Sequence, residues 1–292
     1  MNLAKQLQIQ DFLKVYNIDI LMCQETSVDD DTFNLCEFIK SNFTIIINNS
    51  HNEYGTCCLI KNSFKIGDVS FDTEGRIIIF NIADLTLANV YLPSGTDAIT
   101  RSKREKIISE SLPNLLINRK REGILLGDWN CIVCKEDSMK HPEIKISPCL
   151  RRLIKVMDLK DFHHKFSPKS LQYSHYYKSS SYGTGATRID RGYWYGNVIP
   201  LSSEYIPIAC SDHLSYHVTI KMVGGLEKMS SPRRKPFFKV NPAVVDDIDF
   251  KPEIVEAMVE WNLLKQRFNY PIKDWWEYLV KPGMRKIAIQ RT

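Results

Sequence analysis

Long apolar runs are missing from this chain of 292 residues, and their absence excludes one class of protein. No run approaches the ~18 consecutive apolar residues that a helix needs to span a membrane, so no membrane partner is expected. The residues after Met1 are polar and helix-like, so we expect no secretory leader. The chain also has no evident internal repeat. Its hydrophobic content of 43% suits one large α/β domain with an extension.

Cysteine patterns that bind metal are also scarce. Cys131 and Cys134 form a lone C-x-x-C pair without the second pair that a structural zinc site needs. His141, His163 and His164 are poorly spaced to replace that pair. Most of the eight cysteines lie inside apolar runs, which is typical of buried thiols in a reducing compartment. The sequence therefore favours two cysteines beside an apolar turn over a zinc site.

Charge is unevenly distributed, although the net charge is only +5. Residues 1–96 carry a net charge of −6, residues 97–178 carry +7 and residues 221–292 carry +5. The basic middle part includes Arg101, Lys103, Arg104, Lys106, Arg119, Lys120, Arg121, Arg151 and Arg152. A basic part beside an acidic one suits a protein that follows a phosphate backbone. Solvated helix faces are the alternative explanation for such runs.

The chain does contain a series of short polar motifs, each of which follows a strand-like apolar run. The motifs are Gln24-Glu25-Thr26, Asn89-Val90-Tyr91-Leu92-Pro93, Gly127-Asp128-Trp129-Asn130, Arg188-Ile189-Asp190-Arg191 and Ser211-Asp212-His213. Any one of them alone could be an ordinary turn, a surface strand or a helix cap. Catalytic groups are, however, often placed on loops at strand ends, where a rigid sheet positions them.

Together these motifs supply carboxylates, an amide, a phenol and an imidazole, a set that suits a divalent cation, a phosphate and a water molecule. Mg²⁺ takes oxygen ligands and keeps several waters, so Glu25 and Asp212 are the expected metal ligands, for Mg²⁺ or for Mn²⁺. Asp128 is the expected base, because a carboxylate within hydrogen-bond reach can take a proton from water.

Negative charge that builds on a phosphoryl oxygen needs hydrogen-bond donors directed at it. Asn130, Tyr91 and His213 can donate such bonds. A histidine needs a partner that fixes its tautomer and favours its charged form, and Asp190 is the expected partner of His213. The sequence alone therefore predicts a site for hydrolysis of a phosphate ester.

The hydrophobic pattern predicts a mixed α/β fold, with helices that alternate with strands. Strands are expected at residues 44–47, 56–60, 76–82 and 86–91. Helices are expected at residues 3–16, from residue 29 onward, at 101–117 with an interruption near Pro113, and at 147–156. We expect a domain at 1–222, a linker at 223–236 and a helical connector at 237–292.

At the five motifs the chain resembles the endonuclease/exonuclease/phosphatase superfamily, and more narrowly the endonuclease domain of non-LTR (LINE-type) retrotransposons. The narrower likeness rests on Arg188-Ile189-Asp190-Arg191, the aromatic run Tyr193-Trp194-Tyr195, and Ser211-Asp212-His213. It covers most of residues 1–220. Phe238-Lys239-Val240-Asn241-Pro242, followed by Trp261 and Trp275-Trp276-Glu277, is similar to the connector that precedes the reverse transcriptase in such polyproteins.

The resemblance implies a four-layer α/β sandwich, in which two packed mixed sheets are flanked by helices and the site lies at one end. It also implies one role for each motif residue. These are metal binding by Glu25, contact with the scissile phosphate by Tyr91, handling of water and phosphate by Asp128 and Asn130, support of the histidine by Asp190, and service to metal and phosphate by Asp212 and His213.

In the resembled family a hairpin near residues 165–187 influences which DNA is nicked. We expect Tyr173 and His175 from this segment, and Arg188 and Arg191 from the fourth motif, to contact nucleic acid. The serine and glycine content of the segment also fits a flexible loop.

The resemblance implies a Mg²⁺-dependent endonuclease that nicks one DNA strand and leaves a 3′-hydroxyl. Its partners would be DNA and the reverse transcriptase domain of the same polyprotein, and its location would be the nucleus. The alternatives are another phosphodiesterase or phosphatase of the superfamily, or a catalytically inactive retrotransposon fragment. The family's first strand carries an asparagine near the metal, and this chain starts after it. We therefore expect a truncated N-terminus that leaves two strands with unpaired edges.

Overall fold

The computed structural model describes residues 3–26, 37–49, 55–139, 146–168, 172–179, 183–208, 210–222, 249–268, 272–276, 280, 283–284 and 287. The chain divides into two compact units, Met1–Gly225 and Leu226–Thr292, which are described separately. Among the described residues, no helix has the length and apolar character needed to cross a lipid bilayer. The helix start expected at residue 29 lies outside the described residues.

A six-stranded sheet forms the centre of the first unit, in the order β4-β5-β6-β7-β12-β9. Its strands are β4 (Ile66–Phe71), β5 (Ile77–Ile82), β6 (Leu85–Tyr91), β7 (Glu122–Asp128), β9 (Lys160–Asp161) and β12 (Asp190–Tyr195). β6 and β7 run parallel, and the other neighbouring strands run antiparallel. β5 and β6 are buried along their whole length, because layers of structure cover both faces of the sheet.

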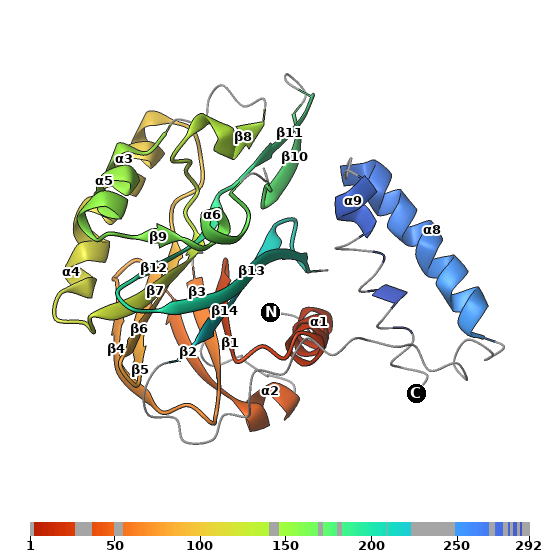
Figure 1. Ribbon diagram of the computed structural model, residues 1–292, viewed down its shortest axis with the longest axis horizontal. Helices are drawn as coiled ribbons and strands as arrows, with labels where there is room; N and C mark the ends of the chain where they lie inside the picture. The colour runs from red at the N-terminus through yellow and green to blue at the C-terminus, as the bar shows by residue number, and fades with distance from the viewer. Residues whose placement is uncertain are drawn as a thin grey trace. The chain divides into compact units, whose positions relative to one another are not determined.

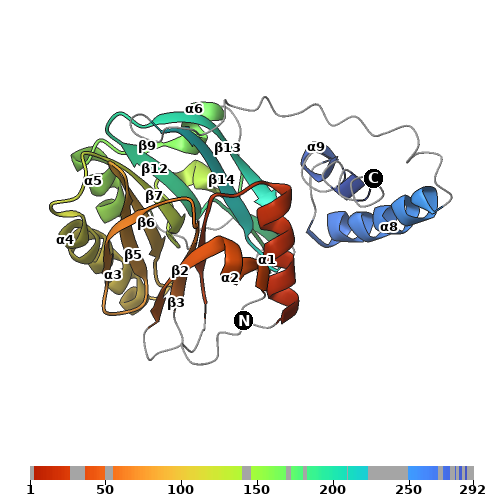
Figure 2. The same cartoon turned by 90° about the horizontal axis from the view of Figure 1, so that it is seen from below.

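Helices cover one face of this sheet (Figure 2). They are α3 (Ala98–Lys106), the π-helical turn η1 (Ile107–Ser111), α4 (Leu112–Leu116) and α5 (Pro148–Val156). The helix predicted at 101–117 is present but starts earlier, because Asp97 accepts a hydrogen bond from the Thr100 amide at 2.9 Å and caps the first turn. The interruption is the π-helical turn that ends just before α4, where Pro113 occupies the first turn. Ile108 and Leu112 pack here on the first core of the domain.

Two smaller sheets pack on the opposite face. One is ordered β1-β3-β2 and the other pairs β13 with β14. Their strands are β1 (Ile20–Gln24), β2 (Phe43–Asn49), β3 (Gly55–Lys61), β13 (Ile199–Pro207) and β14 (Leu214–Lys221). Met22 of β1 and Val218 of β14 pack against the second core, which the six-stranded sheet shares. In the described part of the chain β1 pairs only with β3 and β14 only with β13, so each has one edge without a strand partner.

A last helical layer covers the small sheets from outside. It contains α1 (Leu3–Val15) and α2 (Glu37–Asn42), while α6 (Phe162–Phe166) lies beside β12 and β13. Phe12 and Leu13 of α1 pack on Leu59 in the third core. Helices, large sheet, small sheets and helices thus follow one another (Figures 1 and 2), and the predicted mixed α/β sandwich is confirmed.

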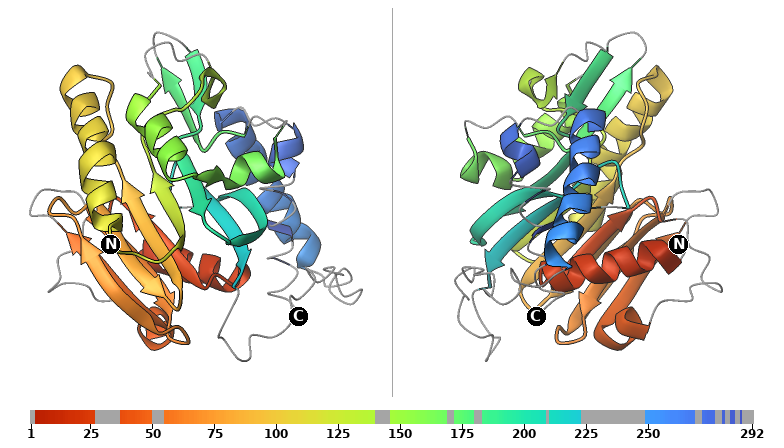
Figure 3. Two further views of the ribbon diagram at one scale, coloured as in Figure 1. Left: turned by 60° about the vertical axis from the view of Figure 1, so that its left-hand side comes forward. Right: turned by 90° about the vertical axis from the view of Figure 1, so that its right-hand side faces the viewer.

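A hairpin of β10 (His175–Ser179) and β11 (Gly183–Thr187) extends beyond the end of the large sheet (Figures 1 and 3). β11 also pairs with β8 (Ser138–Met139). A single bridge joins His175 to His213, just before β14 begins. The segment that the sequence left open as hairpin or flexible loop is therefore a hairpin, and it is anchored near the last motif.

The second unit contains α8 (Phe250–Phe268) and α9 (Ile272–Trp275), so its described part is helical as the sequence predicts. Trp261 is buried with Val280 and Ile287. The indole nitrogen of Trp275 donates to the Trp261 carbonyl at 2.8 Å. These contacts give the unit a small core of its own.

Candidate active site

The ends of neighbouring strands bring together the site residues of the middle motifs. Tyr91 ends β6, Asp128 ends β7 and Asp190 begins β12, and the register pairs Asp128 with each of the other two. Gly127 allows this close approach, since its φ is +152° and an added Cβ would lie 1.8 Å from the Val90 carbonyl oxygen. The spacing of the three side chains is therefore set by a buried sheet.

Glu25 lies on the facing sheet, directly after β1, with a φ of 56°. This left-handed conformation is uncommon for a residue with a side chain and tends to occur at functional positions. The Tyr91 hydroxyl donates to Glu25 Oε1 at 2.9 Å. Burial raises the pKa of Tyr91, and the hydrogen bond to Glu25 and its charge raise it further. Tyr91 therefore remains a protonated donor at neutral pH.

Asn89 joins the two sheets beneath this contact, a role that the sequence analysis missed. Its amide donates to the carbonyls of Cys23 at 3.0 Å and Cys57 at 3.1 Å, and its oxygen accepts from Gln24 at 2.6 Å. Asn89 is fully buried, so these partners satisfy an amide that would otherwise be costly to bury. The available signal was an amide inside an otherwise apolar strand.

Asp128 is buried and held by Asn130. The backbone amide of Asn130 donates to Oδ1 at 2.9 Å, and the side-chain amide donates to Oδ2 at 2.7 Å. Burial and the nearby charge of Asp190 raise the pKa of Asp128, against the opposing charge of His213. A raised pKa makes the ionised carboxylate a stronger proton acceptor.

Asn130 differs from its predicted role as a phosphate donor. Its side-chain nitrogen also donates to the Leu92 carbonyl at 2.9 Å, in addition to Asp128. A carbonyl can only accept, so this contact fixes the orientation of the amide and uses both of its hydrogens. In this structure Asn130 therefore orients Asp128, and its donors are not directed at a phosphate.

Asp190 and His213 form the predicted pair. His213 Nδ1 lies 2.9 Å from Asp190 Oδ2. Burial lowers the pKa of His213, but the hydrogen bond and charge of Asp190 outweigh burial and raise the pKa to about 9. His213 is therefore a cationic donor at neutral pH, with Nε2 available on the other side of the ring.

Ser174 holds both members of this pair, and the sequence analysis missed it. Its hydroxyl accepts from the Asp190 amide at 3.0 Å, and its carbonyl accepts from the Leu214 amide at 2.7 Å, next to His213. Tyr205 adds a hydrogen bond to the Asp190 carbonyl at 2.7 Å. Ser174 is fully buried, and its hydroxyl and its backbone carbonyl together link the start of β12 to the start of β14. A lone serine in a polar segment carries no sequence signal for this role.

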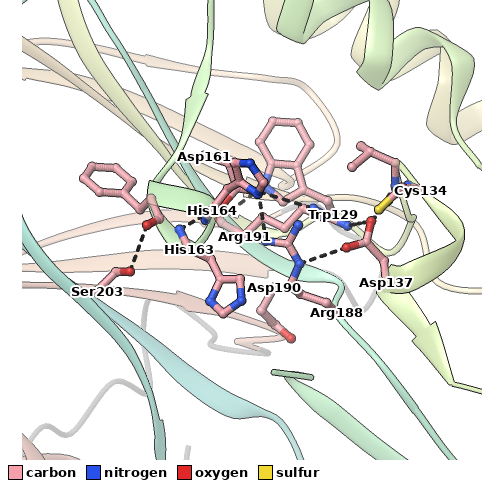
Figure 4. Close-up of polar contacts among 12 residues, drawn as sticks. Trp129, Cys134, Asp137, Asp161, His163, His164, Arg188, Asp190, Arg191 and Ser203 are labelled. Carbon is pink, nitrogen blue, oxygen red and sulfur yellow. Dashed lines mark hydrogen bonds and ion pairs between the residues drawn. The ribbon is translucent and has the colours of Figure 1, made fainter. Parts of the chain in front are cut away.

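Arg188 and Arg191 are not placed to contact nucleic acid as predicted (Figure 4). Arg191 is completely buried and forms ion pairs with Asp137 and Asp161. The Arg188 side chain is 11% exposed, and its guanidinium lies 2.9 Å from Asp137 and 2.8 Å from Asp161. Both arginines flank Asp190 in sequence, so this ion-pair cluster instead anchors the strand that carries Asp190. The sequence could not distinguish a surface cation from one paired in the interior.

The remaining predicted residues lie near the hairpin. The His175 ring is 4.5 Å from the His213 ring and 5.7 Å from the Tyr177 ring, measured between centroids. Asp212 is 74% exposed, and its Oδ2 lies 3.8 Å from His175 Nε2. Burial and the charge of His213 lower the pKa of His175. Tyr173 packs edge-on against Tyr176 and does not line the site.

A cavity of about 260 Å³ lies among the residues of the motifs. Its lining includes Glu25, Asp128, Asn130, His175 and His213, and also Ser94, Gly95, Thr96, Arg101, Arg104, Tyr177, Thr187 and Ile189. Four of the five motifs thus contribute to one cavity. The sequence analysis did not include the segment after Pro93, and this segment forms one side of the lining.

Glu25 and Asp128 bring carboxylate oxygens to the cavity, and such ligands suit a hard divalent cation. Within the described residues, two groups have ligand atoms within 4.8 Å of one another: His175, Asp212 and His213, and Asp128, Asp190 and His213. Asp212 belongs to the first group and Glu25 to neither, so the two predicted metal ligands do not form one tight cluster. Mg²⁺ needs only one or two carboxylates and keeps several waters, which suits this open arrangement.

Comparison with known proteins agrees with the observed fold. Among solved structures, the chain is similar to a 3′ phosphatase, NExo, from Neisseria bound to a product DNA hairpin (18% identity, TM-score 0.62, covering 75% of this chain and 95% of that one). It is also similar to an AP endonuclease from Archaeoglobus fulgidus (19% identity, TM-score 0.60, covering 74% and 94%). No curated protein matches. Residues 2–213 match the Endonuclease/Exonuclease/phosphatase family, and the chain therefore belongs to that family.

Proposed function

We propose that this protein hydrolyses phosphodiester bonds in DNA with the help of a divalent cation, Mg²⁺ or Mn²⁺. One observation carries the proposal: a proton acceptor, Asp128, and a cationic donor, His213, line the same cavity as Glu25. Attack of water on a phosphate diester needs an acceptor for the proton of water and donors for the charge that develops on the phosphoryl oxygens.

The residues of this chain divide the work as follows. Asp128, oriented by Asn130, accepts the proton of the attacking water. His213, held cationic by Asp190, donates from Nε2 to a phosphoryl oxygen. Tyr91 orients Glu25 and stays protonated beside it. Glu25 lines the cavity and would hold a divalent cation, whose positive charge would stabilise the phosphoryl oxygens.

We further propose that cleavage nicks one DNA strand and leaves a 3′-hydroxyl, as in the endonucleases of LINE-type retrotransposons. The support is in the sequence: the run Arg188 to Tyr195, and the connector-like segment from Phe238 to Glu277. On this proposal the reverse transcriptase domain of the same polyprotein is a partner, and the protein acts in the nucleus.

A second candidate activity is removal of phosphate groups from DNA ends. The similar structure from Neisseria is described as a 3′ phosphatase bound to a DNA product, which favours this candidate over phosphatases of lipids or sugars. Both activities use the same water, base and cationic donor. They differ in whether an internal diester or a terminal monoester enters the cavity.

A plasmid-nicking assay tests the proposal. With Mg²⁺ or Mn²⁺ the wild-type protein should convert supercoiled DNA to the open-circular form, and a polymerase should extend the nicks directly, because they carry a 3′-hydroxyl. Asp128→Asn should abolish nicking, whereas Asp158→Asn at an exposed surface pair should not. Intact plasmid in both metals, or equal nicking by Asp128→Asn, would refute it. Release of phosphate from a 3′-phosphorylated oligonucleotide without plasmid nicking would establish the second candidate instead.

A further inference from the structure

The four basic residues of α3, Arg101, Lys103, Arg104 and Lys106, lie in different environments. Lys103 pairs with Glu74 at 2.9 Å. Lys106 is exposed. Arg104 is buried and takes part in backbone contacts. Arg101 alone among these four residues is half-buried, lines the active-site cavity and has an uncommitted guanidinium. The charge run that the sequence could not interpret thus contains one arginine, Arg101, that lines the cavity and whose guanidinium has no partner among the described residues.

Arg104 shapes the segment next to Arg101. Its guanidinium donates to the Pro93 carbonyl at 3.0 and 2.8 Å and to the Gly95 carbonyl at 2.7 Å. These bonds fix the segment that follows the second motif. In this segment Ser94 and Thr96 are exposed and line the cavity. Arg104 therefore supports this segment through its Nε and Nη2 donors.

The Arg101 guanidinium has no hydrogen bond or ion pair with the described part of the chain, whereas its backbone amide donates to the Asp97 carbonyl at 3.1 Å. It nevertheless lines a cavity that also contains Asp128, Glu25 and His213. Asp128 ends β7, and His213 directly precedes β14. Arg101 lies in α3, which follows the segment from Ser94 to Thr96. Arg101 therefore reaches the cavity from a helix that carries none of the proposed catalytic residues.

We propose that Arg101, with the hydroxyls of Ser94 and Thr96, forms a second phosphate subsite, which binds a substrate phosphate next to the one that is hydrolysed. A guanidinium presents two parallel N–H donors that match phosphate oxygens, and hydroxyls complete such a site. The proposal rests on the proposed function only in the identity of the substrate. Adjacent phosphates occur in a nucleic acid strand and also in small molecules with two phosphate groups.

Binding in the presence of a chelator tests the subsite without cleavage. Arg101→Gln should weaken binding of a fluorescent oligonucleotide about tenfold, because one charge-assisted contact is lost. It should also reduce the slope of log Kd against log salt by about 1, as expected for one phosphate contact. Lys103→Gln on the same helix is the matched control and should change neither quantity, since Lys103 pairs with Glu74 outside the cavity.

Oligonucleotides with one neutral methylphosphonate locate the contact. A methylphosphonate at one position should weaken wild-type binding as much as Arg101→Gln does. Combining that methylphosphonate with Arg101→Gln should weaken binding no more than either change alone. Effects that multiply at every position, or equal losses in Arg101→Gln and Lys103→Gln, would overturn the subsite.

A second arm of the experiment uses inositol bisphosphate in place of DNA. If the wild-type protein binds and cuts no DNA, the proposed function fails. The subsite then stands if Arg101→Gln weakens binding of inositol bisphosphate relative to Lys103→Gln, and it falls if the two variants bind alike. Failure of the function and failure of the subsite are therefore distinguishable.

Discussion

Replacing Asp137 by asparagine should strongly destabilise the first unit. Asp137 is 3% exposed and accepts from the Arg188 guanidinium at 2.9 Å, from the Arg191 guanidinium, and from the Val133 and Cys134 amides at 3.0 and 3.1 Å. Among the described residues, the substitution leaves the fully buried Arg191 with one carboxylate partner, Asp161, at 3.5 Å. Removing one partner of a buried ion pair costs about 3–5 kcal/mol, a large part of the ~5–15 kcal/mol that stabilises a typical domain.

Urea unfolding followed by circular dichroism measures this loss. The matched control is Asp84→Asn, since Asp84 is 86% exposed in a surface pair with Lys120 at 3.6 Å. That control should leave the unfolding midpoint unchanged. If Asp137→Asn changes the free energy of unfolding by less than about 1 kcal/mol, the arginines do not depend on Asp137.

The same carboxylate predicts how stability depends on pH. Burial alone would raise the pKa of Asp137, but the guanidiniums of Arg191 and Arg188 and the backbone hydrogen bonds hold it well below its usual range. A depressed folded-state pKa stabilises the protein fully above the unfolded pKa of about 3.9 and progressively less as the pH falls below it. The wild-type protein should therefore lose stability below about pH 4 more steeply than Asp137→Asn. Parallel curves for the two proteins would contradict this account.

Three further outcomes follow from the site. Asn89→Leu should lower the free energy of unfolding by about 1–3 kcal/mol for each carbonyl left without a donor at Cys23 and Cys57, as measured by urea unfolding. Ser174→Ala should slow DNA cleavage about tenfold in kcat with little change in KM, because Asp190 loses a supporting bond, and Ser174→Thr should restore the rate. Chelation of divalent cations should abolish plasmid nicking, and added Mg²⁺ or Mn²⁺ should restore it.

Part of this site was predictable from the motifs, because Glu25, Tyr91 and Asp128 lie at or directly after the ends of apolar strands. Tyr91 and Asp128 were assigned from their place at strand ends, and the sheet register brings them side by side. The partnership of Asp190 with His213 followed from the need of a histidine for a carboxylate. Asn89 and Ser174 were missed, because each acts through hydrogen bonds to segments that are distant in the sequence.

The sequence by itself determined the fold class, the family and the chemical types at the site, since apolar periodicity and local motifs are short-range properties of the chain. Only the tertiary structure decided which charges are available to a substrate. The sequence predicted that Arg188 and Arg191 contact nucleic acid, but ion pairs with Asp137 and Asp161 hold both side chains in the interior. In the sequence Arg101 is one member of a run of basic residues, but in the structure it lines the cavity. The availability of a charged side chain depends on which partners the fold brings within reach, and those partners are distant in the sequence.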